Sequence, residues 1–189
     1  MSLEVEVTVS KFPLWVNYQT LISCYFGEYS TGYGLFLSNP ERPESRSWKR
    51  CLGEVAVFNF KNSVSHQEVI DKIKELGFEM ADIWCLSSML RNWPMIQTTE
   101  YPLDSPVCIV APKTIVSDGK NRFTPFANVI GGVISVDFIH REKNSREYWL
   151  RRWKILAVRW LGETKDDFWT PEYKPERAII GGRFEVFDV

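Results

Sequence analysis

Apolar residues recur at helical spacing in one part of this chain, between residues 65 and 93, and strand-like patterns lie on both sides of it. Strands and helices that are segregated along the chain, rather than alternating, are typical of an α+β fold. The sequence therefore predicts a mainly antiparallel β-sheet with two consecutive helices inserted mid-chain. Because no repeat and no linker-like segment interrupts the chain, residues 1–189 are expected to form a single α+β domain.

The first helix is expected to begin after Ser65, because Glu68 three residues later completes a capping box. Gly77 is expected to end this helix. A second helix is predicted from about residue 81 to 93, before Pro94. The apolar stripes of the two helices are Val69, Ile70, Ile73 and Leu76, and Leu86, Met89, Leu90 and Trp93.

The N-terminal strands are predicted from alternation and from β-branched content. Residues 3–10 place Leu3, Val5, Val7 and Val9 on one side of a strand and polar residues on the other. Further strands are expected at residues 21–26, 33–37 and 53–60. Residues 39–50 carry two prolines and many charges, so they are predicted to form a loop.

The C-terminal half is predicted to return to β-structure. A short strand at 107–111 is followed by a polar turn over residues 113–125 and a long strand over 129–140, in which Gly131 and Gly132 indicate a bulge. A second long strand is expected at 148–161, a loop at 162–177 and a final strand at 183–189.

The charge of the chain excludes a strong overall attraction to nucleic acid or to an anionic membrane. There are 23 basic and 24 acidic residues, which gives a formal net charge of -1. The first residues lack the basic and apolar regions of a signal peptide, and no apolar run approaches the length of a membrane span. The expected location is therefore cytoplasmic, with no membrane partner.

The four cysteines form no metal-binding or disulfide pattern. Cys24, Cys85 and Cys108 lie in apolar surroundings and are expected to be buried, unreactive thiols in a reducing compartment. Cys51 follows Lys49 and Arg50, whose charges would lower its pKa and make it the reactive thiol. Since no histidine is near Cys51 in the sequence, an unreactive thiol is favoured there as well.

The sequence contains no recognisable catalytic or metal-binding motif, so no cofactor and no metal site are predicted and a non-enzymatic role is favoured. His140 follows Asp137 by three residues, and an odd separation on a strand places two side chains on opposite faces. Asp137, His140 and Cys51 are the candidates for chemistry if an active site is assembled from residues far apart in the sequence.

Residues 141–160 combine basic and aromatic side chains more densely than the rest of the chain. On one continuous strand, Trp149, Arg151 and Trp153 would share one face. Basic side chains neutralise phosphates and aromatic rings stack on unpaired bases, but such a stretch is also common where long basic side chains cover apolar surface. The candidate binding residues are Arg146, Trp149, Arg151, Arg152, Trp153 and Lys154.

Three functions remain open from the sequence. The favoured one is a non-enzymatic binding protein that contacts a protein partner through a Trp- and Arg-rich surface, because these residue types are enriched at interface hot spots. The alternatives are a nucleic-acid-binding module that uses segment 141–160, and an enzyme with a dispersed site. A homo-oligomer would be one way to cover exposed tryptophans.

Overall fold

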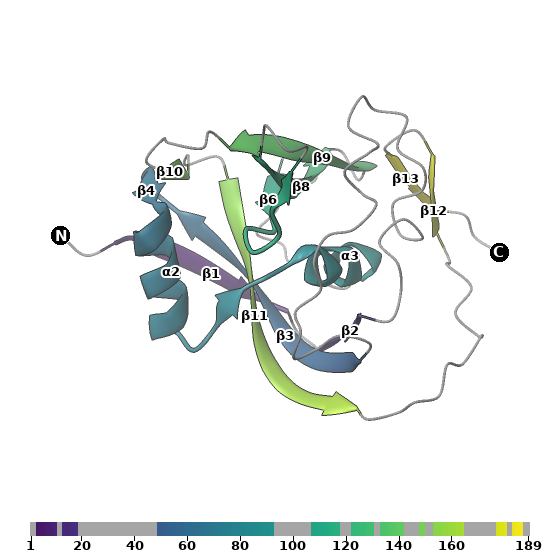
Figure 1. Cartoon of the computed structure of the whole chain (residues 1–189), viewed down its shortest axis with the longest axis horizontal. Coiled ribbons are helices and arrows are strands. Elements are labelled where there is room, and N and C mark those ends of the chain that lie inside the picture. Colours follow the sequence, from purple (N-terminus) through teal and green to yellow (C-terminus); the bar gives the residue numbers. More distant parts are fainter. Residues whose placement is uncertain are drawn as a thin grey trace.

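The computed structural model describes the backbone of ten segments of the chain, and these segments form an α+β fold (Figure 1). A mainly antiparallel sheet carries two helices, as the sequence predicts. None of the helices in the described segments is long and apolar enough to cross a membrane. The described residues are 3–10, 13–18, 49–92, 107–117, 122–130, 133–141, 148–149, 153–164, 177–180 and 183–186.

The strands lie in one large sheet and one small one. The large sheet has the order β1-β3-β11-β6-β8-β9-β13-β12, with β2 beside β3, β5 beside β11 and β7 beside β8. The small sheet joins β10 to β4. The helices are α2 (His66–Glu75) and α3 (Ile83–Arg91). The strands are β1 (Val5–Val9), β2 (Leu14–Asn17), β3 (Arg50–Phe60), β4 (Val64–Ser65), β5 (Glu79–Met80), β6 (Val107–Val110), β7 (Val116–Ser117), β8 (Arg122–Ile130), β9 (Val133–Arg141), β10 (Tyr148–Trp149), β11 (Trp153–Thr164), β12 (Arg177–Ile180) and β13 (Arg183–Val186).

The antiparallel pair of β3 and β11 lies at the centre of the two cores. Its register runs from Lys154 opposite Asn59 to Thr164 opposite Arg50, with a shift at Gly162. Both faces of this pair are buried, which explains why β3 is apolar at successive positions instead of alternating. Among the described strand pairings, β11 with β6 is parallel and the others are antiparallel.

The two helices cover opposite faces of this central pair (Figure 1). On one face, Val69 and Ile73 of α2 pack with Phe58 of β3 and Ala157 of β11. On the other face, α3 packs against the side chains at the intervening positions of β3 and β11. This second core includes residues of β3, β11 and α3: Val55, Val57, Leu156, Val158, Trp84, Leu86, Met89 and Leu90.

Both predicted helices are present, but the second ends at Arg91, and Trp93 of its predicted stripe lies outside the described residues. The hydroxyl of Ser65 accepts from the backbone N–H of Glu68 at 3.3 Å, and the Glu68 carboxylate accepts from the N–H of Ser65 at 2.8 Å. The carboxylate of Glu68 also accepts from the Ser65 hydroxyl at 2.7 Å, and this bond, together with the one from the N–H of Ser65, holds the pKa of Glu68 below its usual value. Gly77 has a φ of 78°, the left-handed conformation expected after a helix. The second helix starts at Ile83, since Asp82 is its N-cap.

The N-terminal strands agree in part with the sequence analysis. Strands β1 and β3 are confirmed, although β3 begins at Arg50, within the region predicted to be a loop. The sequence analysis missed β2, whose four residues are too few to establish a period. The predicted strands at 21–26 and 33–37 lie outside the described residues.

The prediction of one long strand over residues 129–140 is wrong. The structure has two antiparallel strands there, β8 and β9, and Ile130 pairs with Val133. Only Gly131 and Gly132 separate the two paired residues, a dipeptide that is favoured in two-residue hairpin connections. The predicted polar turn is also too long, because Phe123, Thr124 and Pro125 are buried residues of β8.

The prediction of one strand over residues 148–161 is wrong as well. Strand β10 pairs with β4 in the small sheet, whereas β11 pairs with β3 in the large one. The sequence analysis did not foresee β12 and placed its residues partly in a loop. The final strand, predicted over residues 183–189, is present as β13 (Arg183–Val186), which pairs with β9 and β12, and residues 187–189 lie outside the described residues.

The close approach of β3 and β11 at Gly53 gives a stability prediction. A Cβ atom at Gly53 would lie 2.7 Å from Val158 Cγ2 and 3.2 Å from Trp160 Cε3. We expect Gly53→Ala to lower the free energy of unfolding by about 1–3 kcal/mol because this part of the core is overpacked. Urea denaturation followed by tryptophan fluorescence measures the change.

The matched control is Gly162→Ala in the paired strand. A Cβ atom at Gly162 meets no heavy atom within 4 Å, so its effect should stay within about 0.5 kcal/mol. Equal effects of the two substitutions would contradict the packing described here.

Candidate functional site

The basic and aromatic segment 141–160 is divided between two sheets. Trp149 lies in β10, where its backbone pairs with Val64, and Trp153 begins β11, where its backbone pairs with Cys108. Trp149 and Trp153 therefore do not belong to one continuous strand. The shared face that such a strand would give them is not formed. Three of the predicted binding residues lie outside the described residues: Arg146, Arg151 and Arg152.

Two of the predicted binding residues, Trp153 and Lys154, lie at the start of β11. Their side chains face opposite sides of this strand. The Trp153 ring is partly buried and meets the edge of the Phe126 ring, with centroids 5.1 Å apart. The ammonium of Lys154 donates a hydrogen bond to the side chain of Asn59. Asn59 in turn donates to Glu6 at 2.9 Å, so Lys154 belongs to a polar network that crosses three strands.

The carboxylate of Glu6 gives this network a negative member. Hydrogen bonds from Lys61 and from Asn59 lower the pKa of Glu6, and the charge of Lys154 contributes in the same direction. Glu6 is therefore ionised at neutral pH and offsets part of the charge of the two lysines. The predicted binding residue Lys154 thus contributes to the pairing of β1, β3 and β11.

The structure does not bring Asp137, His140 and Cys51 together. Asp137 and His140 are exposed on β9, whose register with β8 is unbroken, so they lie on opposite faces as predicted. The Asp137 carboxylate accepts from the N–H of Phe138 at 2.8 Å. Cys51 is buried in β3, and three strands lie between β3 and β9 in the sheet. Within the described residues, no group of three or more His, Cys, Asp or Glu side chains could hold a metal ion.

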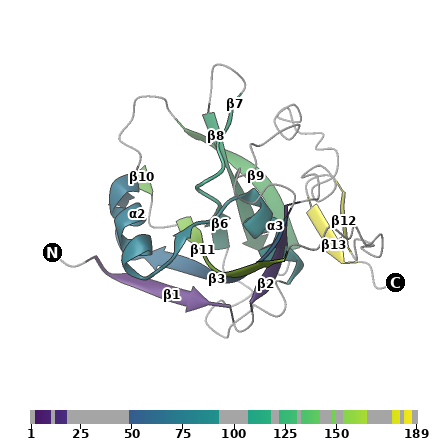
Figure 2. The ribbon, with the colours of Figure 1, turned by 60° about the horizontal axis from the view of Figure 1, so that its bottom comes forward.

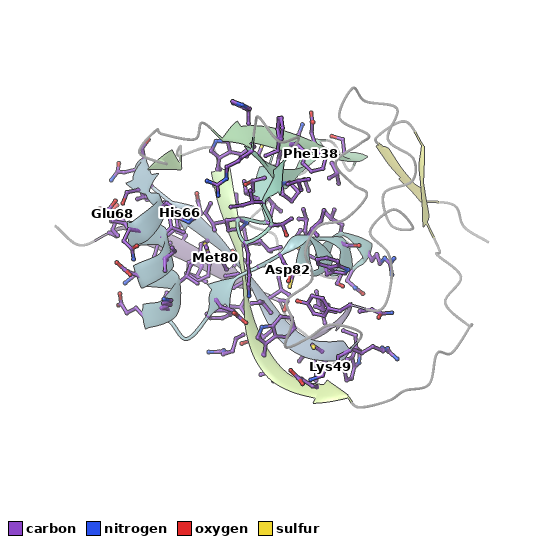
Figure 3. All side chains as sticks on the ribbon, viewed as in Figure 1. Lys49, His66, Glu68, Met80, Asp82 and Phe138 are labelled. Carbon is purple, nitrogen blue, oxygen red and sulfur yellow. The ribbon has the colours of Figure 1, made fainter. Side chains whose placement is uncertain are left out.

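A buried polar cluster joins the end of β2 to the start of α3; we call Tyr18, Asp82 and Cys85 the Tyr18 cluster. The phenol of Tyr18 donates to Asp82 Oδ2 at 2.8 Å, and Asp82 Oδ1 accepts from the N–H of Cys85 at 3.0 Å. The Cys85 sulfur lies 3.9 Å from the Tyr18 oxygen. Figure 3 labels Asp82 at the start of α3, in the interior of the fold.

Burial controls the acid–base properties of the Tyr18 cluster. It raises the pKa of Tyr18 far above its ordinary value, and the nearby Cys85 and Asp82 add to the effect. Burial and the charge of Asp82 likewise raise the pKa of Cys85. Both groups therefore stay protonated at neutral pH, and a protonated thiol is a poor nucleophile. The cluster holds β2 against α3.

A group of apolar and cationic side chains lies on the other side of β2; we define Trp15, Arg50 and Leu52 as the Trp15 surface. Trp15 is exposed, and Arg50 and Leu52 are partly exposed. Trp15 pairs with Leu52, and Leu52 pairs with Gly162, beside Leu161 in the irregular part of β11. The guanidinium carbon of Arg50 lies 5.4 Å from the centroid of the Trp15 ring, within cation–π range. The exposed fraction of Trp15 is 44%.

The Trp15 surface continues the sheet face that α2 covers. Along β3, the residues under α2 are followed by Glu54, whose carboxylate accepts from Arg159 Nε at 2.9 Å. The Arg159 guanidinium lies over the Phe78 ring, 4.6 Å from its centroid, at the end of that core. Leu52 and Arg50 come next on the same face, where the described residues leave Trp15 exposed.

The burial of Cys85 was predicted from the sequence, but Tyr18, Asp82 and Trp15 were not identified as site residues, for different reasons. Asp82 carried a usable signal, because aspartate directly before an apolar helical stripe is a favoured N-cap. Trp15 lies between Leu14 and Val16, which are both buried, so no alternation of polar and apolar residues marked its exposure. The cation–π contact with Arg50 joins positions that are far apart in the sequence and depends on the pairing of β2 with β3.

Comparison with known proteins adds no relative, because no protein-family model, curated protein or solved structure matches this chain. The function must therefore be inferred from the described side chains. Of the two clusters, the Tyr18 cluster is closed to solvent and the Trp15 surface is open to it.

The hydrogen bond within the Tyr18 cluster gives a second stability prediction. Tyr18→Phe removes the donor to the buried Asp82 carboxylate and should lower the free energy of unfolding by about 1.5–3 kcal/mol. In an Asp82→Ala background the same change should cost much less, because the acceptor is already gone. Urea denaturation of the four proteins measures this coupling; additive effects would show that the bond contributes little.

The burial of the cysteines predicts their reactivity. Cys51 and Cys85 are buried. Cys108 is partly exposed, contrary to the sequence prediction, and its thiol donates to Asn128 Oδ1 at 3.5 Å. Among these three, we expect iodoacetamide to modify Cys108 first in the native protein, and all three at similar rates in urea. Peptide-resolved mass spectrometry measures each rate. Native modification of Cys51 as fast as in urea would contradict its burial and revive it as a candidate nucleophile.

Proposed function

We propose that this chain is a non-enzymatic binding protein that contacts a protein partner through the Trp15 surface. The observation that carries the proposal is the exposed Trp15 ring with the Arg50 guanidinium over it. Tryptophan and arginine are the residue types most enriched at interface hot spots. The proposal keeps the function favoured by the sequence and moves it to residues on β2 and β3.

The position of these side chains on strands supports a binding role. Trp15 and Arg50 come from two paired strands and already contact each other, so little side-chain freedom remains to be lost when a partner binds. A cation–π contact contributes about 0.5–1 kcal/mol at an exposed site and about 2 kcal/mol or more once water is removed. A partner that covers the pair would therefore strengthen it.

The charges beside the Trp15 surface favour a protein partner over a nucleic acid. Lys49 pairs with Glu163 at 2.8 Å, and Arg159 pairs with Glu54. Nucleic-acid binding depends on cations that neutralise phosphates, and here carboxylates already offset two cations. The matching partner presents an apolar pocket for Trp15.

The two alternatives remain predictions. The nucleic-acid hypothesis rests mainly on Arg146, Arg151 and Arg152, which lie outside the described residues. Fluorescence anisotropy with labelled single- and double-stranded DNA and RNA at two salt concentrations tests it, with Arg151→Ala/Arg152→Ala as the variant. Binding that weakens steeply with salt and is lost in this variant would favour that hypothesis over the present proposal.

Substitution of Trp15 tests the proposal. Proteins retained by the immobilised wild-type chain should be retained by an Ile115→Ala variant and lost by Trp15→Ala. Calorimetry with the purified partner should then give a loss of affinity of at least about thirtyfold for Trp15→Ala, the size expected for a hot spot. A smaller loss is expected for Arg50→Ala.

The control residue Ile115 is a large apolar side chain with 39% exposure, close to that of Trp15, on a different part of the chain. Thermal denaturation of each variant establishes that the fold is kept. Equal binding by Trp15→Ala and the wild type would reject the Trp15 surface as the binding site.

A further inference from the structure

Strand β1 forms one margin of the large sheet. It pairs with β3 on one side, and the sheet order places no described strand on its other side. Figure 2 shows β1 along the outer boundary of the described elements, and β2 pairs with the other end of β3. An edge strand presents unpaired backbone groups that can pair with another chain.

The hydrogen bonds at both ends of β1 establish which residues present these groups. Ser10 donates to the carbonyl of Val55 at 2.8 Å, and the carbonyl of Glu4 accepts from Lys61 at 3.2 Å. In an antiparallel pair, residues alternate between those bonded to the partner strand and those directed away from it. The even-numbered residues of β1 therefore bond to β3, and Val5, Val7 and Val9 direct their N–H and C=O groups outward.

The side chains of β1 are self-complementary about Val7. If a second β1 runs antiparallel with Val7 opposite Val7, Val5 lies opposite Val9 and Glu6 lies opposite Thr8. In the same register Glu4 lies opposite Ser10, whose buried hydroxyl oxygen accepts from the N–H of Val55, so no two carboxylates are directly opposite each other. Centring the pair on Val5 instead would place Glu4 opposite Glu6 twice, and like charges in direct opposition destabilise a sheet.

The apolar face of β1 supports the same arrangement. Leu3, Val5 and Val7 are partly buried against the core under α2, and Val9 is 36% exposed. Pairing about Val7 would set two rows of valines side by side and would form about six backbone hydrogen bonds between the copies. These valines would connect the core under α2 in one copy with the same core in the other, across one continuous sheet.

We propose that two copies of this chain associate through β1, antiparallel, with the two-fold axis at Val7. The occupant of the edge is a second copy rather than an unrelated strand, because the sequence around Val7 matches itself in charge and in apolar pattern. The proposal rests on β1 alone and does not depend on the Trp15 surface.

Sedimentation velocity over a wide range of concentrations tests the association, and the wild type should show a monomer–dimer equilibrium. Val7→Pro removes an outward-facing N–H and leaves the bonds to β3 in place, a position at which edge strands tolerate proline. We expect it to weaken the dimer at least about thirtyfold, since two bonds related by the axis are lost. Its unfolding curve as a monomer should stay close to that of the wild-type monomer.

Two substitutions at Thr8 distinguish effects on the pairing with a second copy from effects within a single copy. Thr8→Glu would place a carboxylate opposite Glu6 of the other copy and should weaken the dimer, whereas Thr8→Lys would place an ammonium there and should strengthen it. Both remove the same hydroxyl, so effects that come from losing Thr8 itself are common to the two. The Trp15→Ala variant should dimerise like the wild type.

Mild oxidation of cysteine variants tests the register. Val7→Cys should form a disulfide-linked dimer, because residues directly opposite in a bonded pair have Cα atoms about 5.5 Å apart, within disulfide range. Val5→Cys should cross-link no more than the wild type, since its counterpart is Val9. A wild-type chain that stays monomeric at all concentrations, or a dimer unaffected by Val7→Pro and by the charge at Thr8, would overturn the proposal.

Discussion

The pairing of β3 with β11 is the interaction on which the rest of the structure depends. Residues 50–60 and 153–164 are about a hundred positions apart in the sequence, yet together they supply inward-facing side chains to two cores. The helix α2 covers one face of this pair and α3 covers the other. Because both faces are buried, Gly53 has to be small, and Arg159 and Glu54 mark where the α2 core ends.

The remaining features follow from what the two helices leave uncovered. On the α3 side, the Tyr18 cluster closes the end of the core with a hydrogen bond from a phenol to the N-cap carboxylate. On the α2 side, the core ends at Glu54 and Arg159, and Trp15, farther along the same face, stays exposed among the described residues. One sheet thus carries a sealed polar cluster on one face and an open apolar surface on the other.

The success of the sequence analysis depended on whether a signal was local. The capping box at Ser65 and Glu68 gave the start of α2 correctly, because every partner in the motif lies within three residues. The strand predicted across Gly131 and Gly132 failed, because the same dipeptide fits a bulge or a hairpin turn and the choice depends on what Ile130 pairs with. Segment 148–161 failed for a similar reason, since β4 and β3 lie far from it in the sequence.

By itself the sequence determined the α+β class, the positions of both helices and the buried centre of β11 at Ile155, Leu156, Ala157 and Val158. These properties follow from periodicity, capping and apolar content, which act over a few neighbouring residues. Only the tertiary structure decided that Tyr18 meets Asp82, that Arg50 lies over Trp15 and that β1 is at the edge of the sheet formed by the described strands. Each of these depends on strand order and register, which are set by contacts between segments distant along the chain.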